Sequence, residues 1–99
     1  MQIFDAEGNF LDQWTHSMAA NDLYIDDGDV VYLAEASRRI SILKLDGKVI
    51  AQWEEEGSEL GQMVDHPHGI WVDSRGDIYM CEVPFAPNRL TKYERLTDA

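Results

Sequence analysis

The sequence predicts an all-β fold in which similar antiparallel sheets stack on one another. Residues 23–35 are repeated at residues 70–82 without a gap, each residue matching the one 47 positions later. A second pair of segments interleaves with the first, since residues 3–14 match residues 42–53, each residue matching the one 39 positions later. Internal periods of this size are typical of repeat architectures, in which one unit cannot bury its own apolar face and neighbouring units must cover it.

Short apolar runs separated by turn residues predict the strands. The runs are rich in β-branched and aromatic residues and are bounded by Asp, Gly, Ser and Asn, as in antiparallel sheets. The expected strands are Met1–Asp5, Phe10–Trp14, Leu23–Asp26, Val30–Glu35, Arg39–Leu45, Val49–Trp53, Ile70–Asp73, Ile78–Val83 and Leu90–Tyr93.

Turn signals connect these strands into hairpins. The pairs Glu7-Gly8 and Asp46-Gly47 and the triplet Asp27-Gly28-Asp29 each lie between two strands, and Asp-Gly in particular favours a tight hairpin. The segment Glu54–Val64 is the strongest helix competitor, but Gly57 and Gly61 interrupt it. We therefore expect an acidic loop there.

Two strands are apolar on both faces. Val30–Ala34 and Ile78–Cys81 barely alternate between apolar and polar residues. An antiparallel sheet with one wet face would alternate, so these strands belong to sheets that are covered on both sides. Four-stranded blades stacked around an axis, as in a β-propeller, satisfy this requirement.

A family pattern covers nearly the whole chain. It consists of the run His66–Tyr79, the pair Glu82-Val83, the triplet Asn88-Arg89-Leu90, the pair Lys92-Tyr93, and Arg39-Ile40 followed by Asp46-Gly47. The chain thus resembles the NHL-repeat β-propellers, usually six-bladed, and is most similar to the C-terminal part of bacterial peptidyl-α-hydroxyglycine α-amidating lyase-like proteins. The resemblance implies a single segment, residues 1–99, of about two four-stranded blades, with repeats at about 1–53 and 54–99.

The number of repeats implies assembly. The resemblance implies six blades, whereas this chain holds two repeats and a remnant, so three copies would complete a ring. Two blades alone would leave open edges and exposed apolar faces. We therefore expect a homo-oligomer, with a trimer favoured. Met1–Asp5 and Leu90–Tyr93 are copies of the same strand, so one of them must be displaced at each junction.

Two histidines are candidate metal ligands. In the repeat register His68 matches Asn21, and His66 matches Ala19. In the similar lyases, channel histidines bind zinc, so the resemblance implies His68 as a ligand, with His66 as a second candidate. Asn21 suits calcium better than zinc, through its carbonyl oxygen. Alternatively, residues 66–68 form a loop in which Pro67 fixes the entry to a strand.

Other recurring residues have a structural and a functional interpretation. Glu35 and Glu82 could serve as cation ligands or as a general base. Alternatively they pair with Arg39 and Arg89, which follow at matching places, and buried carboxylates are normally paired.

Three further kinds of residue are expected to be structural. Asp26 and Asp73 begin turns, where Asp caps the backbone. Trp14 and Trp53 share one repeat position and are expected in the packing between sheets. Cys81 has apolar neighbours in the sequence and is expected in the core rather than as a nucleophile.

The composition limits the classes of partner. The formal charge of −11 over 99 residues opposes binding to nucleic acid or an anionic membrane. One cysteine permits no intrachain disulfide, and Met1–Asp5 lacks the features of a signal peptide, which predicts a cytoplasmic location if the chain is complete. The sequence predicts a module that binds a small ligand or a protein, and as an alternative a metal-dependent lyase-like or hydrolase segment.

Overall fold

The described part of the chain is all-β. The structure, a computed structural model, describes residues 1–14, 20–36, 38–54, 63, 66–83 and 89–96. Its strands are β1 (Gln2–Phe4), β2 (Phe10–Gln13), β3 (Ala20–Ile25), β4 (Val30–Glu35), β5 (Arg39–Lys44), β6 (Val49–Glu54), β7 (His66–Val72), β8 (Ile78–Val83) and β9 (Arg89–Tyr93). The predicted all-β class is confirmed, and the described residues contain no helix that could cross a membrane.

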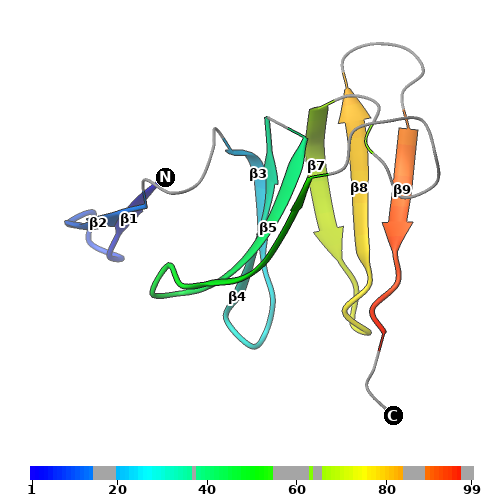
Figure 1. The fold of residues 1–99 in the computed structure, drawn as a ribbon. Helices are drawn as coiled ribbons and strands as arrows, with labels where there is room; N and C mark the ends of the chain where they lie inside the picture. Colours follow the sequence, from blue (N-terminus) through cyan, green and yellow to red (C-terminus); the bar gives the residue numbers. More distant parts are fainter. Residues whose placement is uncertain (15–19, 37, 55–62, 64–65, 84–88, 97–99) are drawn as a thin grey trace.

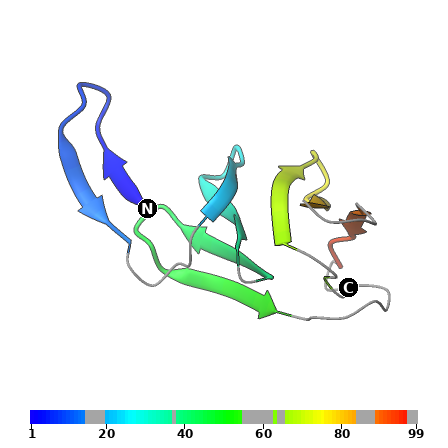
Figure 2. The same ribbon diagram turned by 90° about the horizontal axis from the view of Figure 1, so that it is seen from above.

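The strands form three antiparallel sheets in chain order. They are the pair β1-β2, the four-stranded sheet β3-β4-β5-β6 and the three-stranded sheet β7-β8-β9 (Figure 1). Within a sheet each strand pairs with its neighbour along the chain. Seen from above, the three sheets follow one another in an open row, and the described strands close no ring (Figure 2).

In the four-stranded sheet β3–β6, strand β4 is covered on both faces. On the side of β1–β2, Val31, Leu33 and Leu43 form a core with Trp14. On the other side, a larger core joins the four-stranded sheet to β7–β9, and its buried members are Tyr32, Ala34, Ile40, Met63, Ile70, Val72, Ile78 and Met80. The two-sided burial predicted for Val30–Ala34 is therefore confirmed, and it explains why that run lacks alternation.

The last sheet, β7–β9, is covered on one face only among the described residues. Opposite residues in its register share a face, which groups Trp71, Tyr79, Cys81, Leu90 and Lys92 on the face opposite the core residues Ile70, Val72, Ile78 and Met80. At the edge of this face, the Trp71 ring still meets the Tyr24 ring of β3 edge-on, with the ring centres 4.7 Å apart. We call this group the outer face of β7–β9. Its Trp71 and Leu90 are 60% and 71% exposed. Cys81, expected in the core, lies half-buried on this face, because no described sheet follows it.

The sequence placed the starts of β3 and β7 too late. The expected strands begin at Leu23 and Ile70, whereas β3 begins at Ala20 and β7 at His66. Both strands contain a register shift at matching places, and this shift disrupts the simple alternation on which a strand prediction depends. Most of the predicted acidic loop, Glu54–Val64, lies outside the described residues.

Candidate functional site

Strands β3 and β7 each contain a β-bulge, and each bulge holds one of the candidate metal ligands predicted from the sequence. In β3 the pairing passes from Ala20 to Asp22, and in β7 it passes from Pro67 to Gly69. The residues without an opposite partner are therefore Asn21 and His68, which are 47 positions apart. Bulges redirect side chains and are common next to binding sites. The interpretation of residues 66–68 as a loop is wrong, since they begin β7, where proline is tolerated on an edge strand.

Hydrogen bonds connect the two bulges across the sheets. The Asn21 amide Nδ2 donates to the carbonyl oxygen of Pro67 at 2.9 Å. One residue further on, the Asp22 carboxylate accepts from the backbone N–H of Ile70 at 3.0 Å. Asn21 is thus held beside the backbone that carries His68, and its amide oxygen is the atom that could bind a cation. Sequence reasoning missed Asp22, because its repeat match is a glycine and the contact is between sheets.

Among the described residues, the candidate metal ligands do not form a complete site in one chain. The side chain of His68 is exposed, and those of His66 and its match Ala19 lie outside the described residues. Among the residues that the structure describes, no three His, Cys, Asp or Glu side chains gather closely enough to hold a metal ion. Catalytic zinc sites use three protein ligands, so one chain offers too few described donors at this position.

Glu35 is buried and paired inside the four-stranded sheet. Its side chain is 0% exposed and that of Arg39 is 10% exposed. The Arg39 guanidinium makes a two-pronged contact, Nη2 to Oε2 at 2.8 Å and Nε to Oε1 at 3.2 Å, and Ser41 Oγ donates to Oε1 as well. The hydrogen bond with Glu35 raises the pKa of Arg39 against the opposing effect of burial. The Arg39 guanidinium therefore stays charged, and the geometry of the pair is that of a scaffold element.

Glu82 repeats this arrangement in the last sheet. Its side chain is also 0% exposed, and it accepts from Arg89 Nε at 3.0 Å. The predicted arginine partners are thus confirmed in both repeats. Neither carboxylate is accessible to a ligand from solvent, so neither is placed to act as a general base on an outside substrate.

Asp26 and Asp73 cap equivalent turns, as predicted. Asp26 Oδ1 accepts the backbone N–H groups of Gly28 and Val30 at 2.9 and 3.0 Å. Its Oδ2 accepts the hydroxyl hydrogen of Tyr32 at 3.0 Å. Burial acts to raise the pKa of this carboxyl, but the three hydrogen bonds outweigh it and hold the pKa below its usual value.

The second turn reproduces the first in each contact. Asp73 Oδ1 accepts from the N–H groups of Arg75 and Asp77 at 2.9 and 3.1 Å, and Oδ2 accepts from Tyr79 at 2.9 Å. Burial again acts to raise the pKa, and the hydrogen bonds, that of Tyr79 first, lower it overall. The tyrosine follows its aspartate by six residues in both repeats, a signal that the sequence offered.

Hollows lined by described residues lie between the sheets. One of about 340 Å³ lies between the two larger sheets and is lined mainly by Tyr32, Ile42, Trp53 and Tyr93. A second, of about 450 Å³, lies between the two aspartate turns. A third, of about 280 Å³, lies between β1–β2 and the four-stranded sheet, and Leu23 and Ile25 line it. It exists because the β1–β2 pair covers only part of that face.

The tryptophans pack between sheets as predicted. Trp14 is 5% exposed and belongs to the core on the side of β1–β2. Trp53 meets the ring of Tyr93 edge-on, with the ring centres 5.6 Å apart. Each indole thus joins the last strand of one sheet to the next sheet.

Comparison with known proteins identifies no similar protein. No protein-family model, no curated protein and no solved structure matches the chain.

Proposed function

We propose that the chain is a two-blade, NHL-type propeller segment that binds protein or small ligand and assembles with copies of itself into a larger ring. Three copies would supply the six blades that the resemblance implies. The proposal rests on the two described inter-sheet packings, which follow the same rule in consecutive repeats. In each, a sheet presents the same side to the sheet that follows it.

The outer face of β7–β9 is the observation that carries this proposal. By the repeat, Trp71, Tyr79 and Cys81 match Tyr24, Tyr32 and Ala34 of the four-stranded sheet. By equivalent strand pairing, Leu90 and Lys92 match Ile40 and Ile42. Those residues pack against β7–β9, and Ile40 is 0% exposed, whereas its match Leu90 is 71% exposed. A face whose equivalent is buried by another sheet is suited to receive a sheet.

The opposite end of the molecule offers a surface for it. Leu23 and Ile25, on the β1–β2 side of the four-stranded sheet, are 45% and 48% exposed. Their repeat matches, Ile70 and Val72, are buried against the preceding sheet. The exposed side of Leu23 and Ile25 is therefore the natural counterpart of the outer face of β7–β9, in a head-to-tail arrangement.

The energy of such stacking is moderate. The exposed fractions of Trp71, Leu90, Leu23 and Ile25 range from 45% to 71%, so burying these four side chains completely is worth roughly 3–6 kcal/mol in total. Association costs about 4–15 kcal/mol in lost freedom. Stacking of side chains alone is therefore marginal, and pairing of backbone strands would have to add to it.

Sedimentation velocity over a wide concentration range, with native mass spectrometry, tests the proposal. We expect a concentration-dependent oligomer, with the trimer as the closed form, and we expect Leu90→Asp to remain monomeric with an unchanged fold. The substitution places a charge on an exposed position, so it leaves the isolated chain intact. A monomer at every concentration of the unsubstituted chain contradicts the proposal.

A metal-dependent, lyase-like or hydrolase segment is a second candidate function. The matched bulges support it, because they place Asn21 and His68 equivalently on neighbouring strands. A ring would gather such positions from several copies. Metal analysis of the assembled protein tests this idea, with zinc and calcium supplied separately. Unchanged stoichiometry in His68→Ala and Asn21→Ala would rule it out.

A further inference from the structure

We propose that β1 is an exchangeable strand, and that β9 of a second copy takes its place beside β2 when copies assemble. This inference rests on the proposed self-assembly and specifies the segment that makes the contact. It follows from two incomplete sheets in the same chain. Among the described residues, one sheet ends at an edge strand where the repeat places a further strand, and the other has a pairing interrupted by a register shift.

The repeat assigns β1 and β9 to the same place in a sheet. Ile3 of β1 matches Ile42 of β5, and the pair Gln13-Trp14 at the end of β2 matches Gln52-Trp53 at the end of β6. In the second repeat β9 follows β8 as β5 follows β4. Thus β1, β5 and β9 are third strands, and β2 and β6 are fourth strands.

The last sheet lacks a fourth strand among the described residues. β5 is bonded to β4 on one edge and to β6 on the other, whereas β9 is bonded to β8 only. In Figure 1, β9 forms the outer border of its sheet. A strand at the border of a sheet can pair with a strand of another chain.

The β1–β2 pair has the complementary defect. β1 spans three residues, Gln2–Phe4, and its pairing with β2 is broken by a register shift between Ile3 and Phe4. Phe4 is 52% exposed. Backbone hydrogen bonds of Met1 with Trp14 and of Asp5 with Asn9 extend the pairing beyond β1, so a five-residue strand such as β9 would offer β2 a ladder without the shift rather than a longer one. The exchange would replace β1 without removing β2.

β2 is fixed to its own chain by Trp14, which directly follows it. The Trp14 side chain is buried in the core with Val31, Leu33 and Leu43. Its indole also covers Gly47, where an added Cβ would lie 2.8 Å from Nε1. β2 can therefore stay packed on the four-stranded sheet while the strand paired with it, β1, is replaced.

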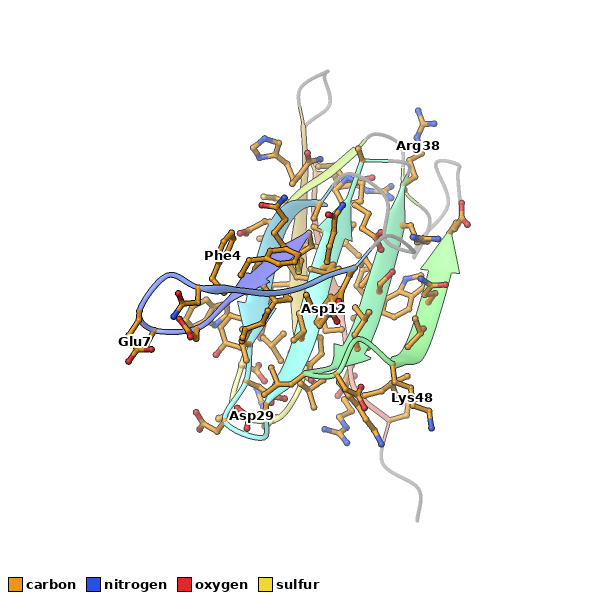
Figure 3. All side chains as sticks on the ribbon, turned by 90° about the vertical axis from the view of Figure 1, so that its left-hand side faces the viewer. Phe4, Glu7, Asp12, Asp29, Arg38 and Lys48 are labelled. Carbon is orange, nitrogen blue, oxygen red and sulfur yellow. The ribbon has the colours of Figure 1, made fainter. Side chains whose placement is uncertain are left out.

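The exchange would also bury the outer face of β7–β9 against the exposed side of Leu23 and Ile25. Figure 3 shows the β1–β2 pair crossing in front of the four-stranded sheet. The 280 Å³ hollow beside Leu23 and Ile25 lies where this pair has no inner strands. A second copy that aligns β9 with β2 brings its β7 and β8 over this hollow, as β7 and β8 already lie over the other face of β3–β6. The contact continues an interface that the chain makes within itself.

Weakening β1 tests the exchange directly. Ile3→Asp places a charge on the half-buried residue of β1, and this residue becomes solvent-exposed once β1 is displaced. We expect the substitution to favour the assembly, lowering its dissociation constant about tenfold, because it removes a competitor for β2. Leu90→Asp is the matched control on the partner strand and abolishes association.

Hydrogen exchange gives a readout that does not depend on a variant. We expect the amides of residues 2–4 to lose protection as the unsubstituted chain assembles, and those of residues 89–93 to gain it. If assembly occurs but residues 2–4 stay protected and Ile3→Asp weakens association, strand exchange is wrong and the proposed self-assembly stands. If no assembly occurs at any concentration, both proposals fail.

Discussion

The four-stranded sheet and the last sheet have the same pattern of residues but different surroundings. Ile40 and Leu90 match in the repeat, yet one is fully buried and the other is 71% exposed. The same holds for Tyr24, which is partly buried against the large core, and Trp71, which is 60% exposed. The comparison teaches that burial in this architecture is decided by the next sheet, since the residue type is apolar in both places.

The buried ion pairs refine this comparison. Glu35 and Glu82 are equally inaccessible, but the side chain of Arg39 is 10% exposed and that of Arg89 is 26% exposed. Removing one partner of a buried pair leaves an uncompensated charge, which costs about 3–5 kcal/mol. We expect Glu35→Ala to lower the free energy of unfolding by about that amount, because it removes the two-pronged carboxylate partner of the mostly buried Arg39.

Glu82→Ala should cost less, because water can reach Arg89 more easily and replace part of the lost interaction. Urea denaturation of both variants in dilute solution measures the difference. Equal losses would show that the two sheets shield their ion pairs to the same degree, against the comparison drawn here.

Ile40 and Leu90 provide the next test. Ile40→Ala empties a fully buried position and should lower the free energy of unfolding by about 2–5 kcal/mol. Leu90→Ala should change the free energy of unfolding by no more than about 0.5 kcal/mol in dilute solution, where the outer face of β7–β9 is exposed to solvent. Thermal and denaturant unfolding of the two variants check this, and a large loss for Leu90→Ala would mean that the face is covered within one chain.

Alanine substitutions at two glycines separate the stability cost of backbone strain from that of crowded packing. Gly8 and Gly47 match in the repeat and have φ values of 88° and 89°. A Cβ at Gly8 meets nothing within 4 Å, whereas one at Gly47 would meet the Trp14 indole at 2.8 Å. Gly8→Ala should cost about 1–2 kcal/mol from the left-handed backbone alone.

Gly47→Ala should cost about 1–3 kcal/mol more, since it also crowds a packed aromatic ring. Trp14 fluorescence should shift toward that of an exposed indole in this variant and not in Gly8→Ala. Equal stability losses with no spectral difference would show that the contact between Trp14 and Gly47 is unimportant for holding β2.

The turn residues Asp26 and Asp73 predict a small change in folding stability that is confined to acidic pH. Both carboxyls have a pKa below the ordinary 3.8, so each contributes stability that is present above that value and lost as pH falls through the lower folded-state pKa. The stability difference between the unsubstituted chain and Asp26→Asn, or Asp73→Asn, should therefore shrink below about pH 3.8. A difference that persists unchanged into strong acid would contradict the assigned hydrogen bonds.

Local chemistry explains what could be predicted from the sequence. The Asp26 turn, the Glu35 partner and the strand β4 all follow from residues close together in the chain, so patterns of spacing were sufficient. The starts of β3 and β7 were misplaced, because a bulge at Asn21 or His68 leaves no mark in the alternation. The hydrogen bond from Ile70 to Asp22 joins residues 48 apart, and only the stacking of two sheets brings them together.

Cys81 reports most directly on the central claim, that the outer face of β7–β9 receives another sheet. It is the single cysteine of the chain and lies half-buried on that face. We predict that its alkylation rate falls as protein concentration rises, and that the rate stays constant in Leu90→Asp. A rate in the unsubstituted chain that is the same at every concentration would contradict the account.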